Sequence, residues 1–376
     1  MNKQILTRNE CNALRGLAII GIFLHNYCHW LGPIVKENEY QYFQKNVDAL
    51  NVALSQLDHH LFMHLVSFFG HYGVPIFLFL SAYGLVMKYE HKPDVTISAN
   101  SSMEVIQFQM RRIWDFIRYH YLKLFKMMIV GYVAFTMVDA ITAGRHHYKV
   151  IDVVSQLLMF NNVLPNPDKI IWPGPYWFFG LMLQFYIIYR LFLYRRHWGV
   201  TVAFIIVSEL IILACNPEGE ALNRWHYNFI GGMLPFGMGL LTARHGEPFS
   251  YQLSAIVILP SIFMIYYFSN GFFNWTLVPL AVIFTCICFI KLLQPKSKTL
   301  FSSFLNSIYQ FLQWMGGISA ALFVCHPITR KIFINAYRHE NLYTGLWLYV
   351  ISSICLAWLF NELMKRIPNP KQKDLS

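Results

Sequence analysis

Charged residues are scarce in this chain of 376 residues. Only 13% of the residues are Asp, Glu, Lys or Arg, whereas 56% are hydrophobic, and the mean hydropathy is +0.40. An ordinary soluble domain has about a quarter of its residues charged. The composition therefore predicts a polytopic membrane protein. The net charge is +11. Because the cytosolic loops of membrane proteins are rich in Lys and Arg, we attribute this excess of positive charge to membrane topology and not to nucleic-acid binding.

Paired cysteines are also missing. The seven cysteines include no CxxC pair, and each lies in or beside an apolar run. We interpret them as small core residues without a disulfide or metal role. The first apolar run continues without a small-residue cleavage site, so no cleavable signal peptide is expected.

The motifs of many soluble enzymes are missing too. The sequence has no GxSxG elbow, no HExxH, no Walker lysine loop and no evident DxD motif, and these motifs mark common hydrolase, metalloprotease and nucleotide-binding sites. No soluble hydrolase-like domain is evident. Any chemistry is therefore expected inside a helical bundle, without a metal ion.

Long apolar runs dominate what is present. A bilayer core of about 30 Å needs about 20 apolar residues per helix, and this rule predicts an all-α protein, a bundle of ten transmembrane helices. The expected spans are residues 12–31, 66–88, 118–141, 174–194, 198–215, 227–243, 251–269, 272–293, 312–335 and 344–365.

The distribution of positive charge predicts the orientation. With a cytosolic N-terminus, ten spans place most of the 30 Lys and Arg residues in the cytosol, so both termini are predicted to be cytosolic. The two long connections are an outer loop at 32–60 and a cytosolic loop at 89–117. The segment 152–163 is too short to cross and is expected at the interface. We interpret residues 1–376 as a single integral-membrane domain.

The first span contains several ionisable side chains. The stretch LRGLAIIGIFLHNYCHW carries Arg15, His25 and His29, and an ionisable group inside a membrane helix indicates function because inserting it costs a few kcal/mol. His25 lies about 15 Å along the helix from Arg15. Neutral imidazole can accept a proton from a hydroxyl or a thiol. The alternative is that Arg15 reaches lipid headgroups while the histidines bond to neighbouring helices.

Other polar side chains fall within the predicted spans. His71 and Ser81 belong to HYGVPIFLFLSAYGL, where close helix packing is the alternative role for Ser81. Glu209, in the fifth span, must be protonated or paired, and we consider it a catalytic candidate. His326 precedes Pro327 near the end of the ninth span and is a candidate for substrate binding.

The end of the cytosolic loop concentrates positive charge. QMRRIWDFIRYHYLK contains Arg111, Arg112 and Arg118, with Trp114 among them. Arginine binds phosphate with two parallel hydrogen bonds and stacks on planar rings. The segment is therefore a candidate site for a nucleotide-bearing donor such as coenzyme A. Lipid headgroups are the alternative ligand.

Separated motifs resemble those of one family. LRGLAIIGIFLH and HYGVPIFLFLSAYGL are similar to the first two helices of membrane-bound acyltransferase family 3. YWFFGLMLQFYIIYRL is similar to the Trp-Phe and Phe-Tyr helix of that family, and MGGISAALFVCHPI to its late Gly-x-x-Ser helix ending in His-Pro. LPFGMGLLTAR is a weaker fifth match. The motifs occur in the family's order over most of the chain.

The sequence departs from the family pattern at two places. The spacing from Arg15 to His25 is one residue shorter than in the family, so that Asn26 or His29 faces as Arg15 does. Ala82 replaces the glycine of Ser-Gly. The identity of the base, His25 or His29, therefore stays open.

The resemblance implies an O-acyltransferase in the inner membrane of a bacterium. Such an enzyme would move an acyl group, expected to be acetyl, from cytosolic acyl-CoA to a sugar hydroxyl of an envelope polysaccharide or lipid-linked precursor. His25 would be the base or a transient acyl carrier, and Arg15 would orient the donor. The three arginines of the cytosolic loop would hold the phosphates, while Trp177 and His326 would line the acceptor side.

Two other classes of protein remain. A transporter or flippase of lipid-linked glycans would also need a polar cavity among ten helices, but it would consume no acyl-CoA. A non-catalytic membrane scaffold would not need the buried Arg, His and Glu residues. The expected partners are a glycan acceptor and membrane lipids, with no nucleic acid, and oligomer formation stays open.

Overall fold

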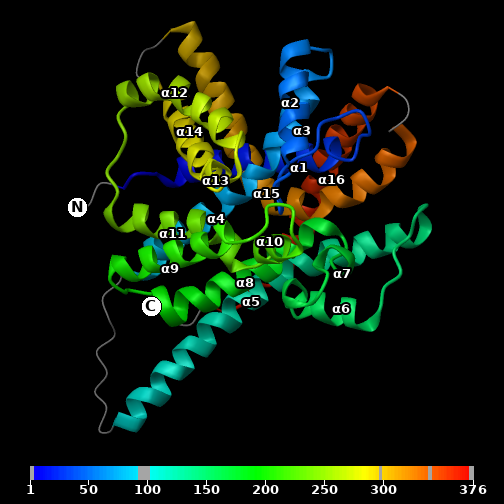
Figure 1. The fold of residues 1–376 in the computed structure, drawn as a ribbon. Helices are drawn as coiled ribbons and strands as arrows, with labels where there is room; N and C mark the ends of the chain where they lie inside the picture. The colour runs from blue at the N-terminus through cyan, green and yellow to red at the C-terminus, as the bar shows by residue number, and fades with distance from the viewer. Residues whose placement is uncertain (1–3, 92–101, 296–298, 338–340, 372–376) are drawn as a thin grey trace.

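The computed structural model describes residues 4–91, 102–295, 299–337 and 341–371, and within these ranges the protein is all-helical, with no strand (Figure 1). The all-α class is therefore confirmed. The main helices are α1 (Arg8–Cys28), α2 (Gln44–Gln56), α3 (Leu61–Phe69), α4 (Gly73–Tyr89), α5 (Ser102–Ile141), α6 (Val150–Leu157), α8 (Trp177–Ile188), α9 (Trp198–Leu213), α10 (Glu220–His226), α11 (Phe229–His245), α12 (Tyr251–Ser269), α14 (Val278–Leu292), α15 (Leu300–Tyr337) and α16 (Leu342–Arg366). The short helical turns are η1 (Gly70–Tyr72), η2 (Asn161–Val163), α7 (Pro167–Ile170), η3 (Gly174–Tyr176), η4 (Tyr189–Leu193) and α13 (Phe272–Trp275).

Several of these segments are long and apolar enough to cross a membrane. Two further apolar helices, α9 and α14, are shorter. These findings show a multi-pass membrane protein. The ten-span topology, which also needs α1 and α11, stays a prediction, as does the side on which the termini lie. The six segments long enough by themselves are Leu61–Tyr89, Met103–Ile141, Gly174–Leu193, Tyr251–Ser269, Leu300–Tyr337 and Leu342–Arg366.

Both long connections contain helices that the sequence analysis treated as loop. In the expected loop 89–117, residues 92–101 lie outside the described residues, but α5 begins at Ser102 and is 40 residues long, or roughly 60 Å at 1.5 Å per residue. No proline interrupts it, so the helix continues from the polar segment into the apolar one. Its first turns extend away from the bundle in Figure 1. The expected outer loop 32–60 contains α2.

Helix α1 lies at the centre of the bundle and begins with a capping box. The Thr7 hydroxyl accepts a hydrogen bond from the Glu10 backbone N–H at 3.2 Å, and Glu10 Oε2 accepts one from the Thr7 N–H at 2.7 Å. These bonds satisfy N–H groups that the first turn leaves free. Glu10 Oε1 also accepts a hydrogen bond from Lys291 Nζ of α14 at 2.7 Å. The start of α1 is therefore fixed to a second helix.

The contact between α1 and α15 is the most extensive between any two helices and depends on glycine. A Cβ atom on Gly16 would lie 1.9 Å from the Leu312 carbonyl oxygen, and a Cβ on Gly316 would lie 1.9 Å from the Asn12 carbonyl oxygen. Small residues let membrane helices approach at backbone distance. The two helices could not adopt this spacing with any larger residue at either position.

The two ends of the described chain lie on the same side of the bundle. Arg8 begins α1 and lines one cavity together with Lys123 of α5. One turn further along α5, Lys126 Nζ donates a hydrogen bond at 2.8 Å to the side chain of Asn369, which follows α16. This side carries Arg15, and we call it the inner side; the opposite side, which carries His29, is the outer side.

The glycine contact predicts a specific loss of stability. In Gly316→Val, the valine side chain would overlap with the backbone of Asn12. We therefore expect the free energy of unfolding to fall by about 3 kcal/mol, as for severe overpacking. The melting temperature of the purified protein in detergent measures this. Gly317→Val is the matched control, because a Cβ there meets nothing within 4 Å. Equal stability of the two variants would contradict the packing.

Candidate functional site

His25 occupies the last turn of α1, where it is enclosed by the start of the second apolar segment. Its side chain is 2% exposed. Helix α1 and η1 meet closely here, because a Cβ on Gly70 would lie 2.5 Å from the Gly21 carbonyl oxygen and 2.7 Å from the His25 Cβ. Glycine at position 70 therefore lets the backbone of the second segment reach the base of the imidazole.

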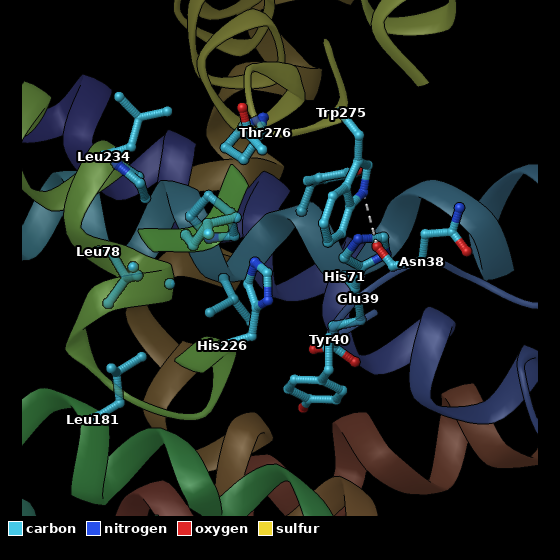
Figure 2. Close-up of a pocket in the computed structure, with 18 of the residues that line it drawn as sticks. Asn38, Glu39, Tyr40, His71, Leu78, Leu181, His226, Leu234, Trp275 and Thr276 are labelled. Carbon is cyan, nitrogen blue, oxygen red and sulfur yellow. Dashed lines mark hydrogen bonds between the residues drawn. The ribbon is translucent and has the colours of Figure 1, made fainter. Parts of the chain in front are cut away.

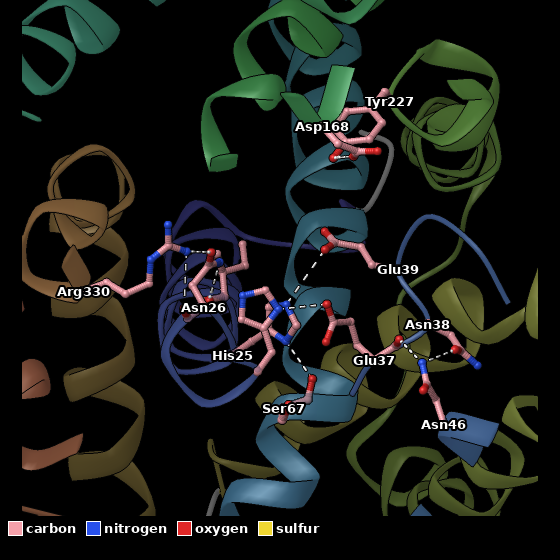
Figure 3. A network of polar contacts seen from close by, with 12 residues as sticks. His25, Asn26, Glu37, Asn38, Glu39, Asn46, Ser67, Asp168, Tyr227 and Arg330 are labelled. Carbon is pink, nitrogen blue, oxygen red and sulfur yellow. Dashed lines mark hydrogen bonds and ion pairs between the residues drawn. The ribbon is translucent and has the colours of Figure 1, made fainter. Parts of the chain in front are cut away.

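A backbone carbonyl fixes the tautomer of His25. Its Nδ1 lies 2.7 Å from the Ser67 carbonyl oxygen, within α3 (Figure 3). A carbonyl oxygen can only accept a hydrogen bond, so Nδ1 must carry the proton. In the neutral ring, Nε2 is then unprotonated and presents its lone pair. His25 is therefore arranged to accept a proton at Nε2.

Three ionisable side chains lie close to the imidazole of His25. Glu39 Oε2 lies 3.9 Å from His25 Nε2. The ring centroids of His29 and His71 lie 4.7 Å and 5.5 Å from that of His25. For His71, neither ring nitrogen has a hydrogen-bond partner among the described residues. The structure thus brings together His25, His29 and His71, three of the residues that the sequence analysis named as site candidates.

Residues 37–42, which we call the outer strap, hold Glu39 in place. Asn46 Nδ2 of α2 donates to the Glu37 carbonyl oxygen at 2.7 Å, and Trp275 Nε1 of α13 donates to the Asn38 carbonyl oxygen at 3.1 Å. The Tyr40 ring stacks on Tyr227 with centroids 4.2 Å apart. Contacts from segments far apart in the sequence therefore position this strap over the end of α1.

The two carboxyl groups of the strap differ in protonation. Burial disfavours the charged form of Glu37, but the hydrogen bond and charge of His29, whose Nδ1 lies 2.9 Å from Oε1, lower the pKa of Glu37 well below its usual range. For Glu39, burial raises the pKa to about 8, and the charge of Glu37 adds to the shift. Near neutral pH, Glu37 is ionised and Glu39 is protonated.

Three of these side chains could also hold a metal ion. The ligand atoms of His25, His29 and Glu37 lie within 4.8 Å of one another. Two nitrogens and a carboxylate oxygen suit a divalent transition metal. In this structure His29 Nδ1 and Glu37 Oε1 instead lie 2.9 Å apart and bond to each other, and the expectation of a site without a metal stays a prediction.

A pocket lies beside Glu39 on the outer side (Figure 2). Its volume is about 80 Å³, and three of the predicted site residues, His71, Trp177 and Glu209, line it. No Lys or Arg is among the described residues that line it. The polar and aromatic lining residues are Asn38, Glu39, Tyr40, His71, Tyr72, Trp177, Glu209, His226, Trp275 and Thr276. We call this space the outer pocket.

A larger, basic cavity opens toward the inner side. Its volume is about 790 Å³, and Arg15 and Ser81, also predicted site residues, line it. Val74 lines both this inner cavity and the outer pocket, and so marks where they approach each other. Ile22, one turn before His25 on α1, lines the inner cavity as well. The basic lining residues of the inner cavity are Arg8, Arg15, Lys88, Lys123 and His120.

The predicted donor-binding residues of α5 lie elsewhere. Arg111 and Arg118 are exposed, Trp114 is 63% exposed, and the Arg112 guanidinium lies over the Phe108 ring at 5.6 Å. None of these four is among the residues lining the inner cavity. The structure brings Lys123, further along the same helix, to the cavity instead.

His326 and its neighbours on α15 form a buried support for α1. His326 is fully buried, and its Nδ1 lies 3.1 Å from the Leu322 carbonyl oxygen. It lines neither the inner cavity nor the outer pocket. One turn on, Arg330 Nη1 donates to Asn26 Oδ1 at 3.1 Å (Figure 3). Asn26, which faces as Arg15 does, is thus bonded to α15, and its Nδ2 donates to the Ile22 carbonyl oxygen at 3.0 Å.

A comparison with models of known protein families identifies the family of this chain. The family model described as an acyltransferase domain, that of the acyltransferase 3 family, matches residues 8–362. This chain belongs to the acyltransferase 3 family. Comparisons with curated proteins and with solved structures gave no significant match. The resemblance seen in the sequence is confirmed, and the protein is a membrane acyltransferase.

Sequence reasoning missed three ionisable residues at the site of this acyltransferase. Glu37 and Glu39 lie in a connection between helices, where hydropathy gives no signal, although two carboxylates in the short segment KENEY could have drawn attention. Arg330 lies inside the ninth expected span. The rule that an ionisable group within a span indicates function, which identified Arg15 and His25, would have selected Arg330 as well.

The protonation state of Glu39 can be measured without an activity assay. Because the pKa of Glu39 is raised to about 8, its carboxyl group is protonated at lower pH and ionises as the pH rises through 8. Infrared difference spectra of the acyltransferase should then show the loss of a protonated-carboxyl C=O band that belongs to Glu39. Glu39→Gln, which has no carboxyl group, should lack this band. Titration of the band near the ordinary glutamate pKa would contradict the assignment.

Proposed function

We propose that this acyltransferase moves an acyl group from acyl-CoA, with acetyl-CoA the expected donor, to a sugar hydroxyl. The observation that supports this most is the Nδ1 hydrogen bond from His25 to Ser67, which leaves Nε2 able to accept the hydroxyl proton. The acceptor is an envelope polysaccharide or its lipid-linked precursor, and the site lies in the cytoplasmic membrane of a bacterium with the inner side facing the cytosol.

The inner cavity supports a donor that carries phosphate groups. Arg8, Arg15 and Lys123 line it from α1 and α5, and arginine and lysine are the side chains that bind phosphate. Its volume of about 790 Å³ falls in the range of small-molecule sites. In this proposal, Arg15 binds the donor and sets the direction in which its acyl end points.

The outer pocket supports an uncharged hydroxyl acceptor. Trp177 and Tyr40 present aromatic surfaces, and Glu39 and Glu209 present carboxyl groups, as is typical of sites that combine an apolar wall with few polar contacts. Sites that enclose a drug-sized ligand measure roughly 300–1,000 Å³, and the outer pocket, with a volume of about 80 Å³, is much smaller. The sugar ring is therefore expected at the outer strap, with only its reacting hydroxyl inside.

Transfer takes place where the two spaces approach each other, at Val74. The acceptor oxygen forms a bond to the thioester carbonyl carbon while its proton passes to Nε2 of His25, and the bond from carbon to sulfur breaks. The coenzyme A thiolate then takes the proton and leaves as a thiol. General-base catalysis by a positioned imidazole typically contributes 10²- to 10⁴-fold to a rate.

A labelling experiment tests the proposed activity. Membrane vesicles that contain the protein are given acyl-CoA labelled in the acyl group, and we expect the label to enter glycan. Translocation of glycan without transfer of label would favour the transporter. Mass spectrometry of envelope glycans with and without the protein should show a mass difference that identifies the acyl group. Vesicles lacking the protein are the control.

The location of the donor can be tested separately. Lys123→Ala removes a positive charge from the inner cavity, so we expect the KM for acyl-CoA to rise about tenfold, for the loss of roughly 1.4 kcal/mol of phosphate binding. Arg111→Ala is the matched control on the same helix and should change the KM less than twofold. A larger effect of Arg111→Ala than of Lys123→Ala would indicate that the donor binds at the first turns of α5, as the sequence analysis predicted.

A further inference from the structure

The imidazole of His25 does not by itself form the wall of either space. The described residues that line the outer pocket include two ionisable side chains in contact with it, Glu39 and His71. An acceptor hydroxyl in the outer pocket therefore meets one of these groups before it meets the Nε2 atom. Which of them connects the pocket to His25 depends on their geometry.

Glu39 is the pocket residue with an oxygen close to Nε2 of His25. Its Oε2 lies 3.9 Å from Nε2 (Figure 3), so a small movement of either side chain makes a hydrogen bond. His71 instead contacts the ring of His25 with the two planes tilted by 58°. A carboxyl group can also accept a proton on one oxygen while donating from the other. Glu39 therefore lies close to Nε2 and can both accept and donate a proton, as a group that links the outer pocket to His25 must.

We propose that Glu39 is a further catalytic residue of this acyltransferase, whose carboxyl group passes the proton of the acceptor hydroxyl to Nε2 of His25. The inference rests on the proposed function, since it concerns the same acyl transfer. It goes beyond that function because it assigns a catalytic group to the outer strap, outside the membrane helices.

The proton transfer balances through both carboxyl oxygens. Oε2 gives its proton to His25 Nε2 while Oε1 accepts the proton of the acceptor hydroxyl, so the carboxyl group stays neutral throughout. The acceptor oxygen bonds to the carbonyl carbon, and the bond from that carbon to the thioester sulfur breaks. The imidazolium of His25 then gives its added proton to the departing thiolate, and the products are an ester and a thiol.

The surroundings of Glu39 favour this role. The strap is anchored on both sides of Glu39, at Asn38 by Trp275 and at Tyr40 by Tyr227, so the carboxyl group has a fixed position. The pKa of Glu39, raised by burial to about 8, leaves it the proton that it must donate near neutral pH. The titratable groups facing it are Glu37 and Tyr40 of the strap, His25 of α1 and His29 at its end, His71 and Tyr72 of η1, Asp168 of α7, His226 of α10, and Tyr227.

Glu39→Gln is the first test, because glutamine has the same shape but cannot relay a proton. We expect the rate of acyl transfer by the full-length protein in lipid vesicles to fall at least 100-fold, the usual lower value for acid–base catalysis. The KM for acyl-CoA and the melting temperature should stay unchanged. Glu218→Gln neutralises an exposed carboxylate of a neighbouring outer loop and should keep the wild-type rate. A Glu39→Gln rate within threefold of wild type would overturn the proposal.

Glu39→Asp and the pH dependence provide a second test. This test is decisive in the case that Glu39→Gln lowers the melting temperature, because a lower rate could then reflect lost stability. Aspartate keeps a carboxyl group, so the rate of Glu39→Asp should be at least tenfold higher than the rate of Glu39→Gln. The wild-type rate should fall as the pH rises through about 8, because Glu39 then loses the proton that it donates. Equal loss in both variants, or a wild-type rate that does not fall above this pH, would overturn the proposal.

These outcomes differ from a failure of the proposed function. A wild-type protein that transfers no label from acyl-CoA would contradict the proposed function itself. A wild-type protein that transfers label, with Glu39→Gln equally active, would contradict only the role of Glu39.

Discussion

The hydrogen bond between Nδ1 of His25 and the Ser67 carbonyl oxygen is the interaction on which the site depends. It places the proton on Nδ1 and the lone pair on Nε2, so the direction in which His25 accepts a proton is set by the backbone of another helix. This bond requires α1 and the second apolar segment to meet closely, which Gly70 permits. A shift of either helix would change both the position and the tautomer of the imidazole.

The same helix α1 connects two chemically different spaces. Its first half contributes Arg8 and Arg15 to the basic inner cavity, and its last turn places His25 against the carboxyl group of Glu39. The glycine contact with α15 holds α1 at the centre of the bundle. In the proposed reaction, a charged donor would bind on the inner side and an uncharged acceptor on the outer side, so that only the acyl group would move between them.

The sequence predicted the parts of this arrangement that follow from local pattern. Each expected span coincides largely with helical residues. The ionisable side chains predicted inside or beside the spans include Arg15, His25, His71 and Glu209, and these lie at or beside the inner cavity and the outer pocket. The extent of α5 was wrong because polar residues were interpreted as loop, although helix formers continue through them. The pair of carboxylates in KENEY was the only local signal for Glu39, because tertiary contacts, which no local pattern predicts, bring this connecting segment to the end of α1.

The most direct test of the account uses His25→Asn. Asparagine can still donate a hydrogen bond to the Ser67 carbonyl oxygen but has no atom in place of Nε2, so it separates the structural role of His25 from its chemical role. The measurement is the rate of label transfer from acyl-CoA to glycan by the purified variant in lipid vesicles, together with its melting temperature. The account predicts a loss of at least 100-fold, as expected for a general base, with an unchanged melting temperature. A rate within threefold of wild type would contradict it.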